Sequence, residues 1–260
     1  KLRRRRRKLY INVKNSVFGG GNQADITTNT NVEIGKATIG GNVYGGGNEG
    51  GVLGNTYVHI KDSNISGSAY AGGNGVNATV NKNAKINIDG TTTNITKSVF
   101  GGGNQAKTGS QDSNDSNSIV NIVGATIGGN VYGGANTSKV YGRTYTNIGY
   151  NTVKDSTINQ NYNDAEDSSL EIGNIIINGT VFGGGEANAS GSEIYDFEYI
   201  SVTKGILINI NAKEHAEFHI KGSIFGSGNA SSSQGESIIK IKDYGSVYEP
   251  QDNISIQCWA

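Results

Sequence analysis

The decapeptide IGGNVYGGGN at residues 39–48 recurs, with substitutions, at seven places along the chain. Each copy has an aliphatic residue, an aromatic residue five positions later, three small residues and then asparagine, which Glu186 replaces once. The aliphatic residues are Val13, Ile39, Ile65, Ile95, Ile127, Ile177 and Ile220. The aromatic residues are Phe18, Tyr44, Tyr70, Phe100, Tyr132, Phe182 and Phe225, and the asparagines are Asn22, Asn48, Asn74, Asn104, Asn136 and Asn229. The aromatic positions lie 26, 26, 30, 32, 50 and 43 residues apart, which indicates one repeating structural unit.

A second recurring element lies between these copies, such as TYVHI at 56–60 and AKINI at 84–88. Its two-residue alternation and its β-branched side chains predict strands with one buried face. The predicted inward positions are Val32, Val58, Ile86, Val120, Thr146, Ile208 and Ile239, followed by Ile34, Ile60, Ile88, Ile122, Ile148, Ile210 and Ile241. The predicted outward column is Asn31, Tyr57, Lys85, Ile119, Tyr145, Leu207 and Ile238.

A unit of about 26 residues with short strands and no helix cannot bury its apolar face alone, so successive units must stack. The sequence therefore predicts an all-β, single-stranded parallel β-solenoid (β-helix) of about eight coils. The 40 glycines among 260 residues support this because they disfavour helix interiors and suit tight corners. The aromatic residues and the asparagines are predicted to form structural ladders from coil to coil, with ring edges that reach water. A β-sandwich is the alternative fold, but sandwiches do not repeat their loop sequences.

The VFGGGN and GGNVYGGGN units resemble the glycine- and asparagine-rich repeats of adhesin-like surface proteins of gut anaerobes. From residue 9 to about 248 the chain resembles the pectin-lyase-like superfamily of right-handed parallel β-helices. The resemblance implies a right-handed coil, a bacterial cell-surface or extracellular location and an adhesive rod. It implies no catalytic residues, because none of that superfamily's site residues can be matched here.

The chain is predicted to comprise a basic disordered tail (1–8), the solenoid (9–248) and a C-terminal tail or next coil (249–260). The long spacings predict two insertions, at about 149–174 and 190–205, the first being either a loop or a degenerate extra coil. The basic tail holds seven of the 22 basic residues, so the remainder carries 15 basic and 22 acidic residues, which argues against nucleic-acid binding. No apolar run is long enough to span a membrane, and the single Cys258 excludes a disulfide framework. The chain is expected to be part of a longer or processed protein.

The apolar members of the outward column point to a contact surface. Tyr57 and Tyr145 are candidate ligand-binding residues, together with Tyr195 and Tyr199 in the second insertion. Candidate partners are a host or microbial glycan, a surface protein or another copy, and flanking domains of the same parent chain. His215, Glu217 and His219 are predicted to share an outward face, but neither they nor the acidic residues near Asp164 predict a metal site or a cofactor.

These features favour a non-catalytic structural and adhesive solenoid segment that acts as a rigid spacer. One alternative is a carbohydrate-active β-helix, either a polysaccharide lyase or hydrolase or a phage tailspike module. It would require a strand face near the insertions lined by two carboxylates or by a pair of basic residues. A second alternative is a subunit that self-assembles through its open end strands.

Overall fold

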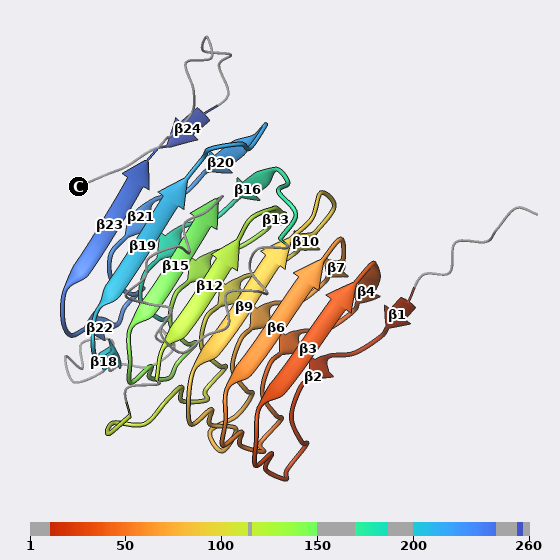
Figure 1. The fold of residues 1–260 in the computed structure, drawn as a ribbon, viewed down its shortest axis with the longest axis vertical. Coiled ribbons are helices and arrows are strands. Elements are labelled where there is room, and N and C mark those ends of the chain that lie inside the picture. Colours follow the sequence, from red (N-terminus) through yellow and green to blue (C-terminus); the bar gives the residue numbers. More distant parts are fainter. Residues whose placement is uncertain (1–10, 114–115, 150–169, 187–199, 243–253, 257–260) are drawn as a thin grey trace, which may run out of the picture.

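The computed structural model describes residues 11–113, 116–149, 170–186, 200–242 and 254–256, and these residues form strands, turns and loops without a helix. Three parallel sheets run along one axis, and each coil passes through one strand of each sheet in turn (Figure 1). Every described strand pairs in parallel with the equivalent strand of a neighbouring coil, so the predicted parallel β-solenoid is confirmed. Among the described residues no helix has the length and hydropathy of a membrane span.

The strands are short in two sheets and longer in the third. Sheet A contains β1 (Ile11–Val13), β4 (Ala37–Ile39), β7 (Asn64–Ile65), β10 (Asn94–Ile95), β13 (Ala125–Ile127), β16 (Ile175–Ile177), β20 (Phe218–Ile220) and β24 (Ile254–Ile256). Sheet B contains β2 (Val17–Phe18), β5 (Val43–Tyr44), β8 (Ala69–Tyr70), β11 (Val99–Phe100), β14 (Val131–Tyr132), β17 (Val181–Phe182) and β21 (Ile224–Phe225). Sheet D contains β3 (Thr30–Gly35), β6 (Thr56–Lys61), β9 (Ala84–Asp89), β12 (Ser118–Ile122), β15 (Thr144–Gly149), β19 (Ile206–Asn211) and β23 (Ser237–Lys242). A small sheet C pairs β18 (Ile200–Val202) with β22 (Ser232–Ser233).

The interior is one continuous cluster of buried apolar side chains, which come from all three sheets. The register of sheet D places the predicted inward and outward residues in the expected columns through every coil, for example Val58 on Ile86 and Tyr57 on Lys85. Each fully buried isoleucine or valine contributes roughly 1.5–3 kcal/mol of transfer free energy. Thr146 is the polar member of an otherwise aliphatic column, and its buried Oγ1 has no hydrogen-bond partner among the described residues.

The seven aromatic residues form one stack on the outer face of sheet B, as predicted. Consecutive ring centroids lie 4.6–5.4 Å apart and the planes are within 15° of parallel. This spacing follows from the distance between neighbouring strands. The expectation that ring edges reach water is wrong inside the stack, where Tyr132 is fully buried. Its faces are covered by the neighbouring rings, and its hydroxyl accepts a hydrogen bond from the Asn130 Nδ2 at 3.0 Å. The last ring, Phe225, is 45% exposed.

The predicted asparagine ladder runs beside this stack. The Nδ2 of each asparagine donates to the Oδ1 of the preceding one, over distances of 2.7–2.8 Å from Asn48 to Asn136. All four bonds therefore point toward the N-terminal coil. Glu186 pairs with Asn136 in the next coil, where an ionised carboxylate has no hydrogen to donate to the Asn136 Oδ1.

The glycines before the ladder are required by the close approach of successive coils. A Cβ added to Gly45 would lie 2.2 Å from the carbonyl oxygen of Ala71 in the coil above. A Cβ on Gly46 would lie 2.8 Å from Gly73. Because both contacts are with backbone atoms, a side chain at either position would force neighbouring coils apart.

Two further ladders satisfy backbone N–H groups at the corners, where a side-chain oxygen accepts from the equivalent residue of the next coil. One column contains Ser16, Asn42, Ser68, Ser98, Asn130, Thr180 and Ser223. The other contains Asn29, Asn55, Asn83, Asn117 and Arg143. The GGGN asparagines differ from these two columns, because their side chains bond to one another.

Length varies at only two of the three corners. The corner between sheets A and B always places the aromatic residue five positions after the aliphatic one. The first insertion follows β15 at the corner between sheets D and A, and β16 pairs directly with β13. In sheet A no described strand lies between β13 and β16, and the residues 150–169 that would form an extra coil lie outside the described residues.

The second insertion interrupts the corner between sheets B and D. The described chain resumes at β18, and Val202 already bridges Val140 in the interior. The predicted boundary at 205 is therefore too late. At the C-terminal end β24 pairs with β20, so residues 254–256 begin a further coil. The basic tail, the acidic residues near Asp164 and Cys258 lie outside the described residues.

Candidate functional site

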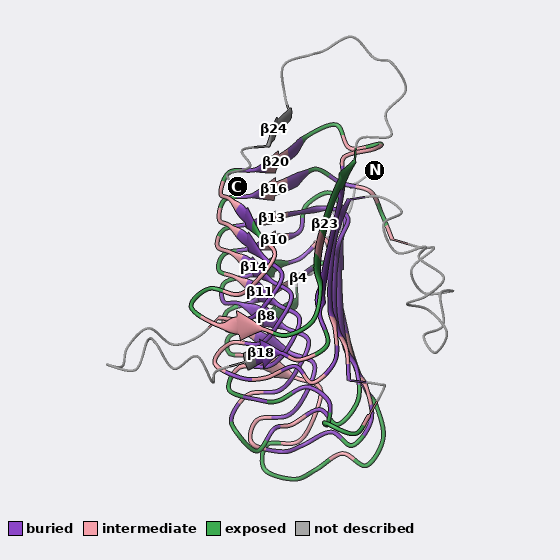
Figure 2. Ribbon diagram, turned by 90° about the vertical axis from the view of Figure 1, so that its left-hand side faces the viewer, coloured by how far each residue is buried: buried purple, intermediate pink, exposed green. Residues whose placement is uncertain are grey.

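The burial of the outer face of sheet D changes along the solenoid axis. In β3 the outward residues are exposed, whereas both faces of β9, β12, β15 and β19 are buried or nearly so (Figure 2). At the other end, β23 is mostly exposed. The central part of this face is therefore an interior surface, while its two ends meet solvent.

The predicted outward column is present, but its central members are covered. Ile119, Tyr145 and Leu207 form an apolar cluster separate from the core, and each is 6–8% exposed. Tyr57, three coils before Tyr145, is half-buried. Of this candidate pair, only Tyr57 presents part of its ring to solvent. Tyr195 and Tyr199 lie outside the described residues, and their ligand-binding role stays a prediction.

A second amide ladder lies beside this column on the same face. Its members are Asn87, Asn121, Asn147 and Asn209, joined Nδ2 to Oδ1 at 2.8 Å. The Asn87 Nδ2 donates to the Tyr57 hydroxyl at 3.1 Å, which fixes the Tyr57 ring at the end of the ladder. Sequence alignment of the strands places these asparagines in one column, a signal that the sequence analysis did not use.

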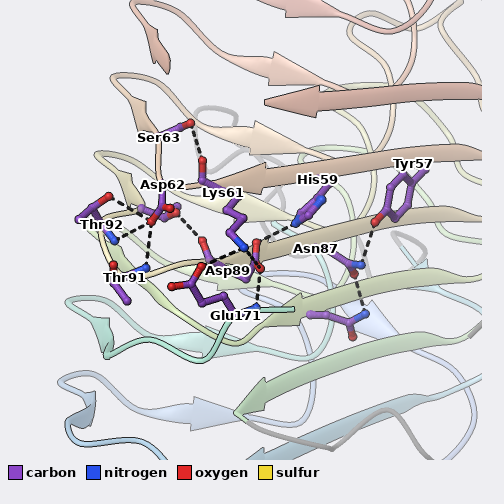
Figure 3. Close-up of polar contacts among 12 residues, drawn as sticks. Tyr57, His59, Lys61, Asp62, Ser63, Asn87, Asp89, Thr91, Thr92 and Glu171 are labelled. Atoms are coloured by element: carbon purple, nitrogen blue, oxygen red, sulfur yellow. Dashed lines mark hydrogen bonds and ion pairs between the residues drawn. The ribbon is translucent and has the colours of Figure 1, made fainter. Parts of the chain in front are cut away.

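A charged cluster is centred on Asp89, the last residue of β9 (Figure 3). Its carboxylate is fully buried. Oδ1 lies 2.7 Å from the His59 Nε2, and Oδ2 accepts the backbone N–H of Glu171 at 2.7 Å. A buried carboxylate is strongly disfavoured unless it is paired, and these two contacts pair both oxygens.

Lys61 completes the cluster from the end of β6. Its Nζ lies 2.9 Å from the Glu171 Oε2 and 4.0 Å from the Asp89 Oδ2. The hydrogen bond with Glu171 is the main cause that raises the pKa of Lys61 above its ordinary value, opposed by partial burial. Because the Lys61 and Glu171 side chains are 36% and 44% exposed, this outer ion pair contributes little to stability.

The backbone at Glu171 is bonded to the same site, since Gly90 N–H donates to the Glu171 carbonyl at 3.1 Å. Gly173 N–H then donates to Val123 in the next coil. The cluster therefore fixes the point where the chain rejoins the solenoid after the first insertion. Nearby, Asp62 accepts from the backbone of Thr91 at 3.0 Å and holds the turn that follows β9.

The exposed side of the cluster carries an aromatic surface, beside which the Lys85 side chain is buried. The rings of Tyr57 and His59 lie 6.5 Å apart, and the Lys85 ammonium lies 6.0 Å from the Tyr57 centroid. The His59 side chain is 23% exposed. When His59 is neutral, its contact with Asp89 places the proton on Nε2. The arrangement can orient an imidazole, and it can stack against a planar or apolar ligand face.

This cluster was not predicted, although His59 is part of the recurring strand segment TYVHI. Lys61 and Asp89 occupy equivalent positions at the ends of neighbouring strands, which the register confirms. Aligning the strand ends would have revealed the opposite charges. Glu171 could not be placed in that way, because it follows an insertion found in a single coil.

The histidines near β20 are arranged differently from the prediction. His215 lies in a turn before the strand, and its Nδ1 contacts the Gly173 carbonyl at 2.7 Å. Burial lowers the pKa of His215, and its ring meets Phe218 edge to face. It therefore does not share an open face with His219. No group of three or more histidine, cysteine, aspartate or glutamate side chains is placed to hold a metal ion within the described ranges.

No family model, no curated protein and no solved structure matches this chain.

Proposed function

We propose that this chain is a non-catalytic, structural segment of a bacterial cell-surface or secreted protein, a rigid spacer with a lateral binding face. The observation that carries this proposal is the unbroken aromatic stack through seven coils, at centroid spacings of 4.6–5.4 Å. Each coil contacts its neighbours through three sheets, the ring stack and several hydrogen-bonded ladders. A bend between coils would disrupt all of these contacts together, which favours a stiff element.

Rigidity can be tested by measuring a distance along the axis. Gln23 and Ala230 are exposed residues beside the first and last asparagines of the ladder. With Cys258→Ser as background, spin labels at these positions should give one narrow distance distribution near about 30 Å, from six inter-strand steps. A broad distribution would contradict the spacer function. The same samples, run on size exclusion over a range of concentrations, distinguish a monomeric spacer from a self-assembling subunit.

The binding face is proposed at the open N-terminal part of sheet D, around Tyr57 and His59. Support comes from the partly exposed Tyr57 ring, held by Asn87, next to the Lys85 ammonium. Aromatic rings of this kind stack on sugar faces, so a host or microbial glycan is the proposed ligand. Tyr57→Ala should abolish signals on a glycan array. Tyr141→Ala is the matched control, because Tyr141 also has a lysine over its ring but lies at another corner.

A carbohydrate-active enzyme is the second candidate. It is favoured by one observation, namely that Asp89, Glu171 and Lys61 lie together where the first insertion rejoins the solenoid. Against it, both oxygens of Asp89 are already paired. The test is to incubate the protein with neutral and uronic polysaccharides. Release of oligosaccharides that His59→Ala abolishes would favour the enzyme over the spacer.

A further inference from the structure

Two Asn–Gly pairs lie in the described part of the chain, Asn74–Gly75 and Asn178–Gly179. This dipeptide is chemically vulnerable, because glycine has no Cβ to keep its backbone nitrogen from the preceding side-chain amide. The glycine nitrogen loses its proton to solvent and attacks Cγ, ammonia leaves, and a succinimide forms. Water then opens the ring at either carbonyl and yields aspartate or isoaspartate.

Asn74 is held in the surface ladder by both ends of its amide. Its Nδ2 donates to Asn48 at 2.7 Å, and its Oδ1 accepts from Asn104 at 2.8 Å. The Gly75 N–H donates to the Asn104 carbonyl at 2.8 Å. Succinimide formation at this site must break all three bonds before Cγ can meet the Gly75 nitrogen.

Asn178 occupies a column without a ladder, in which the neighbouring coils have Gly128 and Lys221. The residue is exposed, and its side chain has no hydrogen bond to any described residue. The Gly179 N–H donates to Gly129 at 3.2 Å, a longer bond than that of Gly75. The backbone here is therefore restrained, but the amide is free to rotate toward it.

We propose that Asn178–Gly179 is a site of spontaneous deamidation, and that the asparagine ladder protects Asn74–Gly75 from the same reaction. The ladder then protects its asparagines against deamidation in addition to joining neighbouring coils. Isoaspartate at residue 178 adds one methylene to the chain at the corner between sheets A and B. It shifts the backbone relative to the coils on either side.

The test is mass spectrometry of peptides after prolonged incubation of the folded protein in mildly alkaline buffer. Deamidation at Asn178 should be at least about tenfold faster than at Asn74, equivalent to about 1.4 kcal/mol of extra barrier. A rate at Asn74 equal to or above that at Asn178 overturns the proposal.

The protective role has its own test. The Asn48→Ala/Asn104→Ala double variant removes both side-chain partners of Asn74, and deamidation at Asn74 should then rise while Asn178 keeps its rate. Asn22→Ala is the control, because it shortens the same ladder without touching Asn74. An unchanged Asn74 rate, or an equal rise at both sites, contradicts protection by the ladder.

Discussion

The rings of Phe100 and Tyr132 lie with their centroids 4.6 Å apart and their planes 4° from parallel. Both rings are in the middle of the stack, where neither can move without leaving a void. Phe100→Ala should lower the free energy of unfolding by about 3–5 kcal/mol in a urea titration. Phe225→Ala, at the 45% exposed end of the same stack, is the control and should cost much less. Equal losses would mean that stacking adds nothing beyond the individual strands.

Thr146 and Val120 are neighbours in one inward column, and both are fully buried. The Thr146 hydroxyl has no hydrogen-bond partner among the described residues. Thr146→Val should therefore stabilise the protein by about 1–2 kcal/mol, the cost of an unpaired buried hydroxyl. The reverse change, Val120→Thr, should destabilise it by a similar amount. Thermal unfolding gives the stability change of both variants. A loss of stability in Thr146→Val would contradict the conclusion that the Thr146 hydroxyl is unpaired.

Glu186 interrupts the polarity of the asparagine ladder. Glu186→Asn supplies an Nδ2 donor for the Asn136 Oδ1 and should raise the free energy of unfolding by about 1 kcal/mol. Glu186→Asp keeps the charge, offers no donor at neutral pH and should give no gain. Chemical denaturation of the two variants makes the comparison, and equal stabilities would show that the ladder tolerates the carboxylate.

Asp89→Ala removes the acceptor of both His59 and the Glu171 backbone. Leaving these groups without a partner should cost about 2–4 kcal/mol. Glu171→Gln removes only the partly exposed ion pair with Lys61 and should cost less than about 1 kcal/mol. Limited proteolysis at the point of rejoining should accelerate in Asp89→Ala alone. Similar behaviour of the two variants would contradict the anchoring role of Asp89.

Alkaline pH should weaken the fold through the tyrosine stack. Burial raises the pKa of Tyr70 and Tyr132 from 10.0 to about 12. The unfolded chain therefore loses these protons first, and stability falls as the pH rises from about 10 toward 12. Tyrosinate absorbance of these two residues should appear together with unfolding. Tyr132→Phe removes one such group and should reduce the slope of stability against pH, and an unchanged slope would argue against this origin.

The columns of this fold could be predicted because copies of the repeat can be aligned with one another directly from the sequence. Once Tyr44 and Tyr70 are placed at equivalent positions, the strand residues between the decapeptides align as well. The same logic failed for properties set by more distant neighbours. The edge of the Tyr132 ring was expected to reach water, yet neighbouring rings cover its faces and the Asn130 amide binds its hydroxyl.

The candidate site was harder to predict from the sequence, because it also depends on residues that are distant along the chain. Asp89 and Glu171 are 82 residues apart, and one of them follows an insertion that has no counterpart in other coils. Periodicity carries no information about such a contact. Likewise, Tyr145 looks like an exposed aromatic residue in its strand pattern, and only the structure reveals its 8% exposure.

Because the corner between sheets A and B has a constant length, one complete coil can be added to the solenoid or removed from it. Phe18 and Tyr44 are related by a 26-residue step and occupy equivalent, directly paired positions in neighbouring coils. After duplication or loss of such a segment, the coils on either side of the change still meet at equivalent positions. A lineage that carries this sequence can lengthen or shorten its reach in increments of about 4.8 Å, without having to evolve a new core each time.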